Sequence, residues 1–237
     1  MCVVWLDSTS QNKCLSGFTP DRHLRVQPYR WVSGTQLRRR KLRLPMRLHS
    51  SMTAPVLQQK QVLLSTARFS VERVTQHLDN GTLLSREVIR HPGAVVIIPV
   101  MDDGRICLIR NYRISLNQVL LELPAGTLEP PETPVATARR ELIEETGYRC
   151  NNIEPLCDFY MSPGILDEHL FCFLATGLVS GETALEHGEQ ITNFPVTIAE
   201  LTQLLRDGII KDSKSISALL YYAMSGADKS FRLVTPD

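Results

Sequence analysis

The sequence predicts an α/β protein of the α+β kind, in which a mixed β-sheet lies between helices. Short apolar runs separated by turn signals fill most of the stretch from residue 60 to residue 178, which is typical of strands. One helical pattern, residues 134–146, interrupts these runs, and two more, 197–208 and 215–226, follow them. Strands grouped around one helix and followed by two others favour a sheet that is covered on both faces.

The chain begins with a basic segment that differs from the rest. Residues 1–60 contain 11 Lys and Arg against 2 Asp and Glu, whereas the remaining residues contain 15 against 23. Since residues 1–57 also lack a sustained hydrophobic period, we expect a disordered extension there that is dispensable for activity. The alternatives are a targeting peptide, or a tail that binds nucleic acid or a membrane surface. Translated sequence ahead of a true start at Met46 or Met52 is a further alternative.

Composition narrows the class of protein. A hydrophobic content of 43% with 22% charged residues is that of a globular protein. No apolar run approaches the roughly 20 residues that cross a bilayer, so we expect no membrane partner. The acidic balance after residue 60 gives no sign of nucleic-acid binding. The six cysteines include no C-x-x-C pair, which favours reduced thiols in a cytoplasmic protein.

Strand patterns divide into an early group and a later one. Residues 58–92 are expected to form an N-terminal antiparallel β subdomain, with a hairpin turn at Asp79-Asn80-Gly81, because Asn-Gly is a strong turn signal. Residues 94–100 and 105–113 are predicted to form another hairpin across the turn at 101–104. Further strands are predicted over residues 119–126, 150–162 and 168–178.

Capping signals bound the helix predicted over residues 134–146. Thr133 suits the N-cap, Pro134 suits the first helical position, and Gly147 suits a left-handed C-terminal cap. The apolar side chains that recur at helical spacing between these ends are Val135, Ala138, Leu142 and Ile143. The pattern predicts one amphipathic helix of about four turns.

Three carboxylates crowd one end of this helix. Glu141, Glu144 and Glu145 stand at positions i, i+3 and i+4, so they share one face. Like charges this close are destabilising unless a cation lies among them, and oxygen ligands suit the hard cations Mg²⁺ and Mn²⁺. The alternative is a solvated acidic face, with Arg139 and Arg140 in surface ion pairs.

The spacing of fixed residues around the helix is that of a known motif. Five residues separate Gly126 from Glu132, and seven more precede Arg140, which is followed by ELIEETGY. This stretch resembles the Nudix box, G-x5-E-x7-R-E-U-x-E-E-x-G-U with U aliphatic, and matches every fixed letter. Only Tyr148 departs, standing where an aliphatic residue is usual. The agreement favours a metal site over a solvated face.

Residues outside the box resemble those of the ADP-ribose pyrophosphatases within the Nudix family. Pro163 lies sixteen residues after Gly147, as the proline of that subfamily does, and Glu168 ends the similar loop S-P-G-x-x-x-E. The segment HPGAV at 91–95 resembles H-x-G-A-V, which opens the central strand of that subfamily. The segment RNYR at 110–113 resembles its R-Q-Y-R, with asparagine in place of glutamine.

The resemblance covers about residues 60–233 and implies a fold, an activity and a partner. It implies a Nudix hydrolase domain over residues 93–237, with metal-dependent hydrolysis of a small-molecule nucleoside diphosphate sugar. The implied reaction converts ADP-ribose, or a related ADP-sugar, to AMP and ribose 5-phosphate with Mg²⁺, or with Mn²⁺, as the cofactor. It also implies a homodimer, in which the strands between Lys60 and His91 pair with the other subunit. Phe69 is then a candidate for stacking on the adenine base.

The resemblance also implies roles for individual residues. The implied metal ligands are the carbonyl of Ala125 and the side chains of Glu141, Glu144 and Glu145. The implied catalytic residues are Glu168, as the group that acts on the attacking water, together with Glu144 and Arg140. The implied substrate-binding residues are Arg113, facing the diphosphate, and Pro163. Arg140 is expected to pair with a box glutamate, and Glu132 to support that network.

Two other functions fit many of the same residues. A pyrophosphatase for another nucleotide sugar, such as ADP-glucose or GDP-mannose, would carry the same box. A non-catalytic, nucleotide-sensing Nudix domain belongs to a different class, and such domains usually lose box carboxylates that this chain retains.

Overall fold

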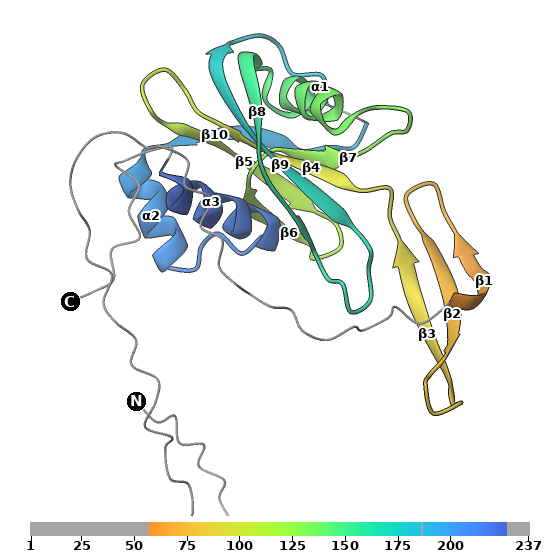
Figure 1. Cartoon of the computed structure of the whole chain (residues 1–237). Helices are drawn as coiled ribbons and strands as arrows, with labels where there is room; N and C mark the ends of the chain where they lie inside the picture. Colours follow the sequence, from red (N-terminus) through yellow and green to blue (C-terminus); the bar gives the residue numbers. More distant parts are fainter. Residues whose placement is uncertain (1–56, 186, 227–237) are drawn as a thin grey trace, which may run out of the picture. The chain divides into compact units, whose positions relative to one another are not determined.

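The computed structural model describes residues 57–185 and 187–226 (Figure 1). All described helices and strands belong to one compact unit. The predicted extension over residues 1–57 lies outside the described residues except for its last position. No helix in the described part is long and apolar enough to cross a membrane.

Three antiparallel strands form a sheet of their own at the start of the described chain, and we call this sheet the arm. In spatial order its strands are β1 (Leu57–Ser65), β2 (Ser70–His77) and β3 (Leu83–Arg90). Residues 78–82 join β2 to β3, and Gly81 there has a φ of 80°, a left-handed value that glycine adopts without strain. The hairpin predicted at Asp79-Asn80-Gly81 is therefore confirmed.

Two further sheets build the main domain. One has the order β7-β4-β9-β8, in which β4 and β9 run parallel and the other neighbours run antiparallel. The other has the order β10-β5-β6 and is antiparallel. The strands are β4 (Ala94–Pro99), β5 (Ile106–Arg113), β6 (Gln118–Glu122), β7 (Ala125–Thr127), β8 (Arg149–Tyr160), β9 (His169–Val179) and β10 (Ile191–Val196).

The hairpin predicted between residues 94–100 and 105–113 is wrong. β4 and β5 belong to different sheets, and an isolated antiparallel bridge between Val100 and Ile106 joins them. Both strands are largely buried, so tertiary neighbours rather than the local turn decide their pairing. The strand predicted over residues 119–126 is likewise divided into β6 and β7, because Pro124 has no N–H to donate to a ladder.

β10 has no counterpart among the predicted strands. Its apolar pattern is interrupted by Thr192, Asn193 and Pro195, and its two end residues, Ile191 and Val196, are the buried ones. The strand forms because it pairs along its whole length with β5. Proline is tolerated there because β10 lies at the edge of its sheet.

Helix α1 (Pro134–Thr146) begins and ends as its capping residues predict. The Thr133 side chain accepts a hydrogen bond from the N–H of Ala136, and Gly147 adopts a left-handed φ of 75° while donating to the carbonyl of Ile143. A Cβ at Gly147 would lie 2.5 Å from the carbonyl oxygen of Gly181, so the neighbouring chain requires glycine there as well. The two helices predicted near the end of the described chain are also present, as α2 (Ile198–Arg206) and α3 (Ser213–Ser225).

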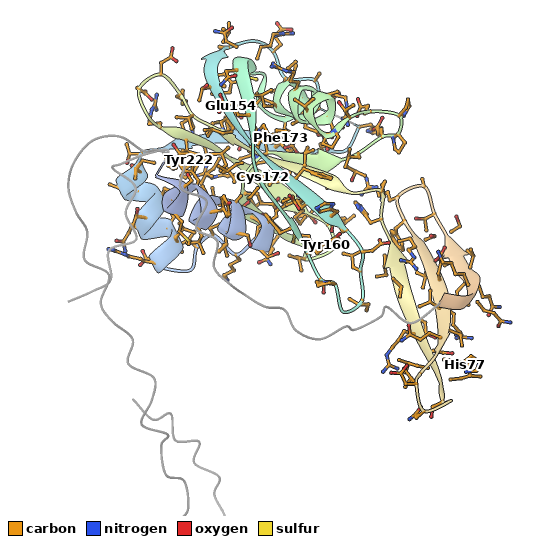
Figure 2. The ribbon with its side chains drawn as sticks, in the orientation of Figure 1. His77, Glu154, Tyr160, Cys172, Phe173 and Tyr222 are labelled. Carbon is orange, nitrogen blue, oxygen red and sulfur yellow. The ribbon has the colours of Figure 1, made fainter. Side chains whose placement is uncertain are left out.

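The mixed sheet is covered by helices on both faces (Figure 1). Alternate residues of β4 point to opposite sides: Val95 and Ile97 pack with α1, whereas Val96 and Ile98 pack with α3. Phe173 and Cys172, neighbours on β9, divide in the same way, and Cys172 shares its cluster with Tyr222 of α3 (Figure 2). The predicted sheet between helices is confirmed, and the buried residues of α1 include Glu141 and Glu145, which contact β7.

Candidate active site

A cavity of about 610 Å³ lies beside the acidic end of α1. The end of β5 contributes Arg113, and the turn between β1 and β2 in the arm contributes Arg68 and Phe69. The residues of the box and of the loop before β10 that line it include Ala125, Gly126, Thr127, Glu141, Glu144, Glu145 and Glu189. The structure therefore brings the predicted metal ligands and Arg113 to one cavity.

Arg140 organises the carboxylates of the box. Its Nε donates to Glu132 Oε1 at 3.1 Å, and its Nη1 donates at 2.8 Å both to Glu141 Oε1 and to Glu144 Oε2. Its Nη2 donates to the carbonyl of Thr127 on β7 at 3.3 Å. These bonds pair Arg140 with Glu132 and with two glutamates of the helix, so that one side chain fixes three carboxylates against β7.

Two close contacts hold the other carboxylate oxygens against the start of the box. Glu145 Oε2 accepts a hydrogen bond from the N–H of Ala125 at 2.8 Å. Glu141 packs over the Cα of Gly126, where an added Cβ would lie 1.9 Å from its carboxyl carbon. Glycine at position 126 is thus required by space and not by backbone conformation, because no left-handed φ occurs there.

Burial shifts the ionisation of these carboxylates. Loss of hydration raises the pKa of Glu141 to about 7 and that of Glu145 to about 8. The charge of Glu144 also raises the pKa of Glu141, and the charge of Glu141 raises that of Glu145. Arg140 lowers the pKa of Glu141, and the N–H of Ala125 lowers that of Glu145. Because these carboxylates are costly to ionise on their own, a bound cation would stabilise their ionised form.

The donor atoms around the cavity suit a divalent cation of the Mg²⁺ kind, because they are carboxylate and carbonyl oxygens. Within residues 57–185 and 187–226, no three acidic, His or Cys side chains already converge as a metal cluster. These carboxylates do not converge because their oxygens are already hydrogen-bonded. Arg140 donates to Glu141 and Glu144, and the N–H of Ala125 donates to Glu145. The residues fit the ion in chemistry, and binding it would require these carboxylates to turn.

Arg113 is held by a buried carboxylate that the sequence patterns do not single out. Its Nε and Nη2 donate to the two oxygens of Glu122 at 2.9 and 2.6 Å, and Glu122 is only 1% exposed. Lys214 of α3 donates to the same carboxylate at 2.7 Å and also pairs with Asp212 at 2.9 Å. Two cations therefore neutralise Glu122, and the bidentate contact fixes the plane of the Arg113 guanidinium.

Glu168 and Pro163 lie apart, although one loop carries both. Glu168 lines a second cavity of about 390 Å³, which shares Arg113, Ala125, Gly126 and Thr127 with the first. Glu168 Oε1 lies 3.8 Å from Nδ1 of His91. Pro163 instead lines a separate hollow of about 240 Å³ with Arg90 and Tyr160. The structure thus places Glu168, but not Pro163, beside the carboxylate site.

Several residues of the site are not recognisable from the sequence. Arg68 is an ordinary strand-end arginine by pattern, and Glu122 and Lys214 stand 92 residues apart. Only the position of Glu122, four residues before Gly126 of the box, could have drawn notice. Phe69, a candidate by resemblance, lines the first cavity together with Glu189.

Gly126→Ala is expected to reduce kcat about 100-fold with little loss of stability. The obstructing atoms belong to the end of the flexible Glu141 side chain, which can swing away, so the fold survives while a box carboxylate is displaced. Steady-state kinetics and thermal unfolding should be measured for Gly126→Ala, Glu141→Ala and the double variant. If the contact is the cause, the double variant is no worse than Glu141→Ala alone. Independent, additive losses would contradict this explanation.

Comparison with characterised proteins places these motifs in context. Residues 90–219 match the family model described as the NUDIX domain. The chain is 40% identical over 154 residues to the methanol dehydrogenase activator of Bacillus methanolicus, covering 64% of this chain and 83% of that protein. It is 36% identical over 152 residues to the ADP-ribose pyrophosphatase of Bacillus subtilis, covering 63% and 82%. The GDP-mannose pyrophosphatase of Yersinia enterocolitica is 34% identical over 179 residues, covering 69% and 93%.

The fold has a counterpart among solved structures. The crystal structure of an ADP compounds hydrolase superposes with a TM-score of 0.66, covering 74% of this chain and 96% of that chain at 24% identity. At this identity the likeness supports the architecture alone. The family match spans more than half of the chain and includes the box, α1 and the strands that position them. The chain belongs to the Nudix family and is a Nudix hydrolase.

Proposed function

We propose that this enzyme hydrolyses the diphosphate bond of ADP-ribose, giving AMP and ribose 5-phosphate. The observation that carries the proposal is the wall that the two cavities share, made of Arg113 and residues 125–127, because the box carboxylates line one cavity and Glu168 lines the other. A relative named ADP-ribose pyrophosphatase supports the choice of substrate. The retained carboxylates favour catalysis over nucleotide sensing.

Each residue has a role that follows from its position. Arg113 binds the diphosphate, and its bidentate contact with Glu122 orients the guanidinium towards the cavity. The carbonyl of Ala125, with Glu141, Glu144 and Glu145, would hold Mg²⁺ or Mn²⁺. Such an ion, when bound, supplies charge neutralisation of the diphosphate and a lower pKa for water. Pro163 acts on substrate binding through the shape of the loop.

Glu168 acts on the attacking water as the proton acceptor. As the proton moves to its carboxylate, the water oxygen forms a new bond to one phosphorus. The bond from that phosphorus to the bridging oxygen breaks, and the bridging oxygen keeps the electron pair on the other phosphate. One water is consumed and two monophosphates leave, which balances the reaction.

The arm supplies the part of the cavity that would recognise the base. Phe69 is 37% exposed and lines the cavity together with Arg68. An exposed aromatic ring can stack on adenine, and stacking on an aromatic side chain contributes about 1–3 kcal/mol per base. Arg68 adds a positive charge at the same end, suited to a phosphate or to the face of the base.

The substrate assignment is tested by a panel comprising ADP-ribose, ADP-glucose, GDP-mannose and diadenosine polyphosphates, compared by kcat/KM with and without Mg²⁺. ADP-ribose should give the highest value, and all turnover should require the ion. Another member that exceeds ADP-ribose by about tenfold, or about 1.4 kcal/mol, would replace it as the substrate. Binding without turnover of any member would instead identify a nucleotide sensor.

We propose that the enzyme is a homodimer joined through the arm. Val62, Leu64 and Leu83 of the arm are 60%, 50% and 58% exposed, and strands with open edges readily pair with another chain. Light scattering should therefore give about twice the chain mass of 26.7 kDa. The variant with Val62→Lys and Leu83→Lys should become monomeric, whereas Ile209→Lys, at an exposed apolar residue outside the arm, should not. A wild-type monomer with full activity would contradict the proposal.

We infer a reducing compartment, such as the cytoplasm, from the cysteines. The four in the described residues, Cys107, Cys150, Cys157 and Cys172, are all free. Cys157 and Cys172 even face each other across β8 and β9 without being bonded. Burial raises the pKa of both thiols, which keeps them unreactive.

A further inference from the structure

The loop that carries Glu168 is fastened to the last strand of the arm. The N–H of Ile89, on β3, donates to the carbonyl of Ile165 at 2.9 Å, and the N–H of Asp167 donates back to the carbonyl of Ile89 at 3.1 Å. These two bonds make a parallel bridge between Ile89 and Leu166. The loop between β8 and β9 thus continues the arm sheet for one residue.

The side chain of Asp167 strengthens this attachment with both of its oxygens. Oδ1 accepts a hydrogen bond from the backbone N–H of His91 at 2.9 Å, and Oδ2 accepts one from Arg90 Nη1 at 3.0 Å. Arg90 in turn donates to Glu72 of β2 at 2.8 Å. One carboxylate therefore ties the loop to the backbone just after β3 and, through Arg90, to the middle strand of the arm.

Glu168 follows Asp167 directly, and its side chain lines the cavity that it shares with Arg113. The loop also has its own turn, in which the carbonyl of Ser162 accepts from the N–H groups of Ile165 and Leu166 at 3.0 and 2.8 Å. The Glu168 carbonyl accepts from the N–H of Met161 at 3.2 Å, and Glu168 Oε1 lies 3.8 Å from His91 Nδ1. A Cβ at Gly164 would meet nothing within 4 Å and the side chain of Ile165 is exposed, so the side chain that fastens the loop to the arm next to Glu168 is that of Asp167.

We propose that Asp167 is a positioning residue that holds Glu168 in its working orientation through the arm. The inference rests on the proposed function, in which Glu168 accepts a proton from water. It makes the arm part of the catalytic apparatus rather than only a dimer contact. A carboxylate that merely stabilised the arm would act on folding, whereas this one acts on turnover through its neighbour.

A double-mutant cycle tests the proposal on the full-length chain, with kcat and KM for ADP-ribose and the melting temperature as readouts. Asp167→Ala should lower kcat about 10- to 100-fold, as loss of a supporting contact does, with KM changed less than about threefold. In the Glu168→Gln background, Asp167→Ala should lower kcat less than about twofold, because the effect of Asp167 on kcat passes through Glu168. The matched control is Glu87→Ala, which removes the 2.9 Å ion pair with Arg73 inside the arm and leaves the loop untouched. This control should keep wild-type kcat.

The outcomes separate the positioning role from the role of Glu168. Equal losses in both backgrounds, or a loss in Glu87→Ala as large as that in Asp167→Ala, would overturn the positioning role alone. A silent Glu168→Gln would overturn the proposed role of Glu168 and the inference with it. If Asp167→Ala fails to fold, Asp167→Asn replaces it. The amide oxygen can still accept from His91, while the contact with Arg90 is lost, so a smaller loss of kcat with the same coupling is expected.

Discussion

Glu145→Gln is expected to lower kcat at least about 1,000-fold, or about 4 kcal/mol of transition-state stabilisation, while the protein stays folded. The side chain is 4% exposed and lies among the box carboxylates. Glutamine keeps an oxygen that can accept from the N–H of Ala125 but removes the charge that a divalent ion needs. Burial raises the pKa of Glu145, so the charge is already costly and the neutral variant should be at least as stable.

Kinetics at several Mg²⁺ concentrations, together with thermal unfolding, would measure both expectations for Glu145→Gln. The matched control is Glu154→Gln, on the exposed side of β8 and away from the cavity, which should retain wild-type kcat (Figure 2). Turnover near the wild-type value at any Mg²⁺ concentration would show that Glu145 does not anchor the ion. A lowered melting temperature would show that the carboxylate supports the fold instead.

The parts of the site that the sequence predicts are those encoded locally. Thr133 and Gly147 bound α1 through contacts within a few residues, and the spacing of the glutamates places them on one face of that helix. Arg140 reaches Glu144 because the two stand one helical turn apart, and it reaches Glu132 in the loop that directly precedes the helix. Short-range geometry of this kind follows from helical periodicity alone.

The parts that the sequence does not predict depend on contacts between distant segments. One of the two partners of β5 is β10, some eighty residues further along the chain, whereas local turn signals favour β4. The contact between Glu122 and Lys214 and the attachment of Asp167 to β3 join segments that periodicity does not relate. These long-range contacts hold Arg113 and the loop of Glu168 in place, so the sequence identifies the candidate groups but not the contacts that hold them.

Glu168→Gln is expected to lower kcat about 100- to 10,000-fold while KM changes little, because a general base acts in the transition state rather than in substrate binding. The glutamine is nearly isosteric, so it can occupy the same wall of the cavity that Glu168 shares with Arg113, yet it cannot take a proton from water. Single-turnover kinetics with ADP-ribose would separate the chemical step from product release.

A loss confined to the chemical step identifies Glu168 as the group that takes the proton from the water. Substitution of Glu182, an exposed loop glutamate, by glutamine serves as the control and should leave kcat unchanged. If Glu168→Gln proved equally silent, another group would have to accept the proton, and Glu189 on the wall of the first cavity is then the carboxylate to substitute next. If a rise in KM accounted for the whole fall in kcat/KM, kcat would be unchanged, and Glu168 would act by contacting the bound substrate. The ratio of the two effects therefore decides whether Glu168 acts on the water or on the substrate.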